Sequence, residues 1–184
     1  IRDTVADYAE LIARVVGVDV EVVDAGLNRL AGTGLYASGV GENIRAEGET
    51  YRHVMRIRRS FVMETPREHV ICTRCPGRDL CRETLSISTP IIDGSDVLGV
   101  IGLVCSTDED RARVLGHKDV YVQFIERCAE FILHKLHDHA DLLRARSFLD
   151  IMLRILEINS RGIVIFNAKG GISYLNDIAR RDLG

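Results

Sequence analysis

The chain contains a β-hairpin pattern that limits the folds open to it. Residues 87–92 and 97–105 are two strand candidates, and the turn-forming segment Asp93-Gly94-Ser95-Asp96 separates them. Turn residues between two such runs predict adjacent antiparallel strands. Residues 18–22 alternate valine with acidic side chains, the period of a half-buried strand, and turn residues 24–28 let residues 29–33 return as its neighbour.

Helical patterns surround these strands. Val5, Tyr8 and Ile12 fall on one face of a predicted helix over residues 4–16, and residues 51–59 form a second candidate helix. Antiparallel strands interspersed with helices predict an α+β fold, in which one antiparallel sheet is flanked by helices.

Three of the five cysteines lie within ten residues, as Cys72, Cys75 and Cys81. The two-residue gap in this C-x2-C-x5-C pattern lets two thiolates converge on one metal ion or cluster. Pro76 and Gly77 reverse the chain and bring Cys81 back toward the pair. We predict Cys105, at the end of the second hairpin strand, as the fourth metal ligand.

The chemistry at these cysteines stays open between three alternatives. Sulfur ligation suits both an iron–sulfur cluster and zinc, and a cysteine–proline step favours the cluster. A thiol/disulfide redox switch is the third alternative. Cys128 lies within a helical pattern, where we expect a small buried apolar side chain.

Residues 117–158 carry apolar side chains at alternating spacings of three and four. The pattern runs from Val122 to Leu136 and resumes, one residue out of phase, from Leu142 to Leu156. It predicts one long helix of about 60 Å whose coiled-coil seam is interrupted by a register slip. We expect a second copy of the chain to cover this seam; the alternative is a helix packed on its own domain.

A new unit begins after Asn159. Residues 162–166 and 172–175 form a second hairpin pattern, and Asn176 can cap a following helix. These 25 residues are too few for a domain, so we interpret them as the truncated start of one.

Composition argues against several classes of function. The net charge of −3 gives no general electrostatic reason to bind nucleic acid or an anionic membrane. No apolar run approaches the length needed to cross a bilayer. No nucleophile–base pair stands out, and Ser86, Ser88 and Thr89 have no histidine nearby in the sequence, so we expect no enzyme activity. Clustered thiols without a signal peptide predict a cytoplasmic protein.

The chain resembles the N-terminal sensory region of sigma-54-dependent transcriptional regulators in residues 66–76, in Cys81, and in residues 87–94 and 98–105. The resemblance is strongest to those of anaerobic Firmicutes, including the proline reductase regulator group. Residues 162–176 are similar to the opening of a PAS domain. The resemblance implies that DNA, ATP and sigma-54 RNA polymerase are bound only through domains absent from this chain.

We therefore predict three parts. Residues 1–115 form a GAF- or PAS-like sensor domain with the cysteine cluster, residues 116–158 a dimeric signalling helix, and residues 159–184 the start of a PAS domain. The predicted function is sensing of redox state or a ligand through a metal or iron–sulfur centre, with transmission along the coiled coil. A metabolite-binding sensor with structural zinc, or a thiol switch, is the alternative.

Overall fold

The computed structural model describes residues 2–136, 142–158 and 161–183. An antiparallel five-stranded sheet lies at its centre, in the order β2-β1-β5-β4-β3. Its strands are β1 (Asp19–Asp24), β2 (Arg29–Gly32), β3 (Phe61–Met63), β4 (Leu85–Asp93) and β5 (Asp96–Cys105). The predicted hairpin is confirmed as β4 and β5, which pair from Leu85 with Cys105 to Asp93 with Asp96.

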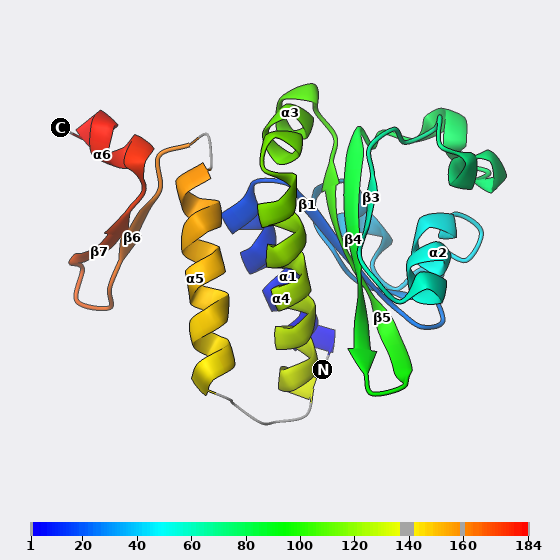
Figure 1. The fold of residues 1–184 in the computed structure, drawn as a ribbon, viewed down its shortest axis with the longest axis horizontal. Coiled ribbons are helices and arrows are strands. Elements are labelled where there is room, and N and C mark those ends of the chain that lie inside the picture. Colours follow the sequence, from blue (N-terminus) through cyan, green and yellow to red (C-terminus); the bar gives the residue numbers. More distant parts are fainter. Residues whose placement is uncertain (1, 137–141, 159–160, 184) are drawn as a thin grey trace.

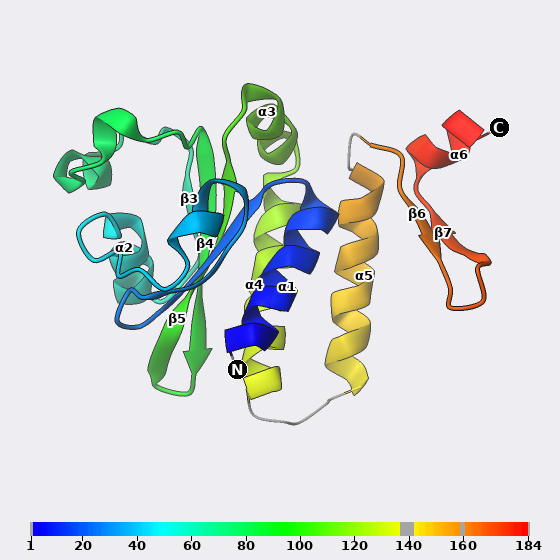
Figure 2. The same cartoon turned by 180° about the vertical axis from the view of Figure 1, so that it is seen from behind.

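Helices cover one face of the sheet, and α2 with several irregular segments covers the other (Figures 1 and 2). The helices are α1 (Arg2–Val16), α2 (Glu49–Ile57), α3 (Asp108–Gly116), α4 (Lys118–Leu136) and α5 (Leu142–Ile158). In the described part of the chain, no helix has the length and apolar character of a membrane span. The predicted α+β fold, an antiparallel sheet flanked by helices, is confirmed.

Alternation along the strands divides the side chains between two cores. Val20, Val22, Leu85 and Ile87 face the helix layer and pack with buried residues of α1, α4 and α5. The other core packs α2 against the opposite face. A side chain's position in this alternation therefore determines whether it packs against the helices or against the irregular segments.

The predicted single helix over residues 117–158 is wrong for the described residues. Two helices form instead, and α5 runs antiparallel to α4 and packs against it (Figure 1). The Phe148 ring of α5 stacks on Phe131 of α4, with centroids 5.0 Å apart. Ile151 and Ile155 of α5 are buried in the helix-face core. Much of the apolar stripe is thus covered by the chain's own domain, although Leu149 stays exposed. The predicted register slip falls on residues 137–141, outside the described residues.

The last described segment is a small hairpin followed by a helix. Strands β6 (Val164–Phe166) and β7 (Ile172–Leu175) pair antiparallel, and α6 (Asp177–Leu183) follows. The buried Asn176 side chain accepts hydrogen bonds from the backbone of Ile163 and Ala179. The predicted hairpin and the capping role of Asn176 are confirmed.

Candidate functional site

The three clustered cysteines lie on one irregular segment between β3 and β4. This segment, residues 64–84, contains two short 3₁₀ turns, Val70–Arg74 and Arg78–Leu80. Cys72, Cys75 and Cys81 are half-buried free thiols. Burial raises the pKa of Cys75 and of Cys81, and the Glu83 carboxylate raises the pKa of Cys81 further. These thiols are therefore less acidic than an exposed cysteine.

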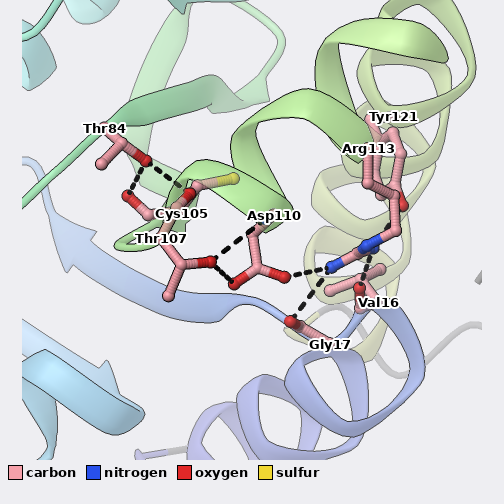
Figure 3. A network of polar contacts seen from close by, with 8 residues as sticks. All are labelled: Val16, Gly17, Thr84, Cys105, Thr107, Asp110, Arg113 and Tyr121. Carbon is pink, nitrogen blue, oxygen red and sulfur yellow. Dashed lines mark hydrogen bonds and ion pairs between the residues drawn. The ribbon is translucent and has the colours of Figure 1, made fainter. Parts of the chain in front are cut away.

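Cys105 lies on the other face of the sheet. Its backbone is close to the end of the cysteine segment, because Leu85 pairs with it and Thr84 donates a hydrogen bond to its carbonyl. Its side chain, however, belongs to the helix-face core, near Asp110 and Arg113 (Figure 3). Burial, with a smaller effect of Asp110, raises the pKa of Cys105 to about 12.

The four predicted ligands do not fit a single metal centre in this arrangement. Strand alternation points the Cys105 thiol away from the segment that carries the other three. Within the described ranges, no group of three or more His, Cys, Asp or Glu side chains is arranged to hold a metal ion. Cys128 is fully buried in the core, as predicted.

A pocket of about 370 Å³ lies on the sheet face opposite the helices, partly beneath the cysteine segment. Its walls come from the sheet, the 3₁₀ turn Gly34–Gly39, α2 and the cysteine segment. The lining residues are Glu21, Arg29, Leu35, Tyr36, Ile44, Glu47, Gly48, Thr50, Tyr51, Cys75, Gly77, Leu80, Cys81, Arg82, Glu83 and Ser86. Two of the predicted site residues, Cys75 and Cys81, therefore contribute to the wall of a pocket.

A buried ion pair forms one side of this pocket. Arg29 Nε donates to Glu21 Oε1 at 2.6 Å, and the Tyr51 hydroxyl donates to Glu21 Oε2. Arg29 also donates to the Gly39 carbonyl at 3.2 Å, an approach that any side chain at position 39 would block. Burial raises the pKa of Glu21 despite these donors. Removing either Glu21 or Arg29 would leave an unpaired charge in the protein interior and would destabilise the fold.

A second carboxylate completes the pocket wall. The Tyr36 hydroxyl donates to Glu83 Oε1 at 2.6 Å, and the Arg29 guanidinium lies over the Tyr36 ring, 5.2 Å from its centroid. Burial raises the pKa of Glu83, and burial together with Glu83 raises the pKa of Tyr36. The pocket thus combines hydrogen-bond acceptors, aromatic side chains and thiols in one concave surface.

Apart from Cys75 and Cys81, sequence reasoning missed the pocket residues. Glu21 alternates with valines, and this pattern is equally typical of a carboxylate facing solvent. The structure shows it 2% exposed. Only the folding of Gly34–Gly39 and α2 over this strand, far along the chain, converts Glu21 into a pocket residue.

The chain is similar to proteins of transcription and signalling. No family model matches it. It is 24% identical over 184 residues to UacR of Escherichia coli (strain K12), a protein named as a uric acid sigma-54-dependent transcriptional regulator. The match covers the whole chain but 31% of UacR, so the chain spans about a third of the length of this curated relative.

Solved structures share the fold. A GAF domain/HD domain protein from Geobacter sulfurreducens aligns with a TM-score of 0.51 at 14% identity, over 75% of this chain and 94% of its own. The nlh2 GAF domain of A. aeolicus aligns with a TM-score of 0.53 at 13% identity, over 74% and 86%. At this identity the likeness shows the fold alone, and that fold is GAF-like.

Proposed function

We propose that this chain is the sensory region of a cytoplasmic sigma-54-dependent transcriptional regulator and that its GAF-like domain binds a small molecule. The observation that carries the proposal is the pocket containing Glu21, Arg29, Tyr36, Tyr51 and Glu83. Similarity to UacR over the whole chain supports the regulatory assignment. Contacts with DNA, ATP and sigma-54 RNA polymerase belong, in this proposal, to other parts of the whole protein.

The lining determines which ligands suit the pocket. Glu21, Glu47 and Glu83 supply carboxylate oxygens, which accept hydrogen bonds when ionised. Arg29, the one buried cation in the wall, is already paired with Glu21 at 2.6 Å. A ligand with N–H donors would satisfy the carboxylates. A phosphate is disfavoured, because three carboxylates outnumber the paired Arg29 and the exposed Arg82 in the lining. The aromatic rings of Tyr36 and Tyr51 suit a planar ring system.

A nitrogen heterocycle of the purine type meets these requirements, since it is planar and carries ring N–H groups beside carbonyl acceptors. The name of UacR refers to uric acid, which belongs to this chemical class. We therefore propose an oxidised purine base as the ligand.

Isothermal titration calorimetry of the purified chain with xanthine, hypoxanthine and urate tests the proposal. We expect at least one base to bind, and xanthosine monophosphate to bind at least about tenfold more weakly, because its phosphate meets the carboxylates. Glu83→Gln removes a charged acceptor and should weaken binding by about tenfold or more. The control Glu68→Gln, at an exposed position of the cysteine segment, should leave affinity unchanged. Failure of all three bases to bind would refute the ligand class.

The iron–sulfur or zinc centre remains a prediction about Cys72, Cys75 and Cys81. All three lie on one short segment, which favours it, but their arrangement does not form a complete metal site. Anaerobic purification followed by analysis for iron, sulfide and zinc tests it. Cys75→Ala should abolish any stoichiometric metal, and Cys105→Ala should leave it unchanged because Cys105 faces the helices. A metal-free protein that forms a disulfide would instead favour the thiol switch.

The segment after α5 is, in this proposal, the opening of a PAS domain. Its hairpin exposes Ile165, Phe166 and Ile172, apolar side chains that a complete domain would cover. Limited proteolysis of the full-length protein tests this, since residues 161–183 should be protected there and cleaved in the present chain.

A further inference from the structure

A chain of polar contacts begins at Thr84, the residue that follows the pocket residue Glu83. The Thr84 hydroxyl lies 3.1 Å from the Cys105 carbonyl oxygen and 3.0 Å from that of Thr107 (Figure 3). Thr107 is the N-cap of α3: its hydroxyl accepts from the Asp110 amide at 3.1 Å and donates to Asp110 Oδ2 at 2.6 Å. Thr84 is therefore tied to the start of α3.

Arg113 extends these contacts to two further helices. Its Nη2 donates to Asp110 Oδ1 at 2.7 Å, and its Nη1 donates to the Tyr121 hydroxyl of α4 at 2.6 Å. The same guanidinium donates to the carbonyls of Val16 and Gly17, at the C-terminal end of α1, at 2.8 and 3.2 Å. One side chain thus holds α1, α3 and α4 together (Figure 3).

The Arg113 side chain is poorly placed to change partners independently. It is 9% exposed, and its Nε has no hydrogen-bond partner among the described residues. A displaced Asp110 would leave a buried charge with fewer contacts, which costs more than the loss of an exposed ion pair. A shift at Thr107 or Asp110 is therefore expected to move Arg113 with them.

The pocket and helices α1 and α4 lie on opposite faces of the sheet. Glu21, Ser86 and Tyr51 face the pocket side of the sheet, while α1 and α4 pack on the opposite face. Glu83 is bonded to Tyr36 in the pocket wall, and the peptide bond joins it to Thr84 at the margin of the sheet. The contacts from Thr84 to Arg113 pass around this margin to the helix layer.

We propose that Thr84, Thr107, Asp110 and Arg113 couple the pocket to helices α1 and α4. The inference rests on the proposed function in that the ligand would act by displacing Tyr36 or Glu83. A change there alters the position of Thr84, hence the cap of α3, and Arg113 then shifts its contacts with the end of α1 and with Tyr121. Energetic coupling carried by hydrogen-bond networks of this kind is measurable by substitution.

Hydrogen–deuterium exchange of the purified chain tests the coupling without any ligand. Tyr36→Phe removes the hydrogen bond to Glu83 and should raise exchange about threefold or more in peptides covering residues 12–18 and 117–124. This remote response should vanish in a Thr84→Val background and persist in Thr84→Ser, which keeps the hydroxyl. Circular dichroism establishes that each variant is folded.

A second variant, Arg113→Lys, tests whether the result in Thr84→Val comes only from an effect of that substitution on folding. Arg113→Lys keeps the positive charge but lacks the forked guanidinium that bonds Asp110, Tyr121 and α1 together. It should also abolish the remote response. The inference is overturned if Tyr36→Phe leaves α1 and α4 unchanged, or if their response survives in both Thr84→Val and Arg113→Lys. The purine titration is a separate measurement. A negative exchange experiment therefore does not refute the proposed ligand site, and a negative titration does not refute the coupling.

Discussion

Glu83, which lies largely enclosed in the pocket wall, is one carboxylate that makes the stability of this domain depend on pH. Burial raises its pKa above the ordinary value of 4.5, although the Tyr36 hydroxyl opposes the rise. The folded state therefore holds the proton more tightly than the unfolded state. The resulting stabilisation is fully present below the unfolded pKa and is lost as pH rises through the folded one.

We predict that the melting temperature of the chain falls between mildly acidic and neutral pH and that Glu83→Gln makes this fall smaller. Glutamine cannot ionise, so it removes one of the groups whose deprotonation costs stability. Thermal unfolding followed by circular dichroism at a series of pH values measures the slope. Glu68→Gln is the matched exposed control, and an unchanged slope in Glu83→Gln would contradict the assignment.

Only some of the individual site residues could be predicted from the sequence. Cys75 and Cys81 were identified by spacing and do line the pocket. Cys105 was chosen because the end of its strand can return beside the cysteine segment, and its backbone does so. Strand alternation nevertheless turns its thiol to the other face. Glu83 had no pattern around it, because its burial depends on Tyr36, which is 47 residues away in the sequence.

Helix α5 shows, at the scale of elements, why an apolar stripe does not identify its partner. The spacing correctly predicted helices with one apolar face, but the same stripe fits a second chain or the chain's own domain. Ile155 is fully buried with α1 and α4. The strands were easier to predict, because a turn such as residues 93–96 forces two neighbouring segments to pair.

We predict that Ile155→Ala lowers the free energy of unfolding by about 2–5 kcal/mol, the usual cost of emptying a core site. Leu11→Ala, whose side chain is 46% exposed on α1 and outside the predicted dimer face, should change it by less than about 0.5 kcal/mol. Urea denaturation measures both. Equal, small effects would mean that α5 does not pack on the domain in solution.

At the scale of the whole molecule, the outer side of α5 offers a surface for a second copy. Leu149 and Leu153 are one helical turn apart and remain 57% and 43% exposed. Homodimerisation therefore stays our prediction, with this face of α5 in place of a continuous coiled coil.

Sedimentation equilibrium should show a dimer that dissociates on the double substitution Leu149→Glu with Leu153→Glu. Leu11→Glu on α1, where the side chain is 46% exposed, is the matched control and should leave the dimer intact. A wild-type chain that sediments as a monomer at every concentration would refute the prediction.

The division of the central sheet into two faces has an evolutionary consequence. Glu21 and Ser86 face the pocket, whereas their neighbours Val22, Leu85 and Ile87 hold the helices. In the proposed sensor, substitutions at alternate positions along one strand would change the pocket lining while leaving the helix-face core in place. Related chains would then differ in ligand and share the same helix layer.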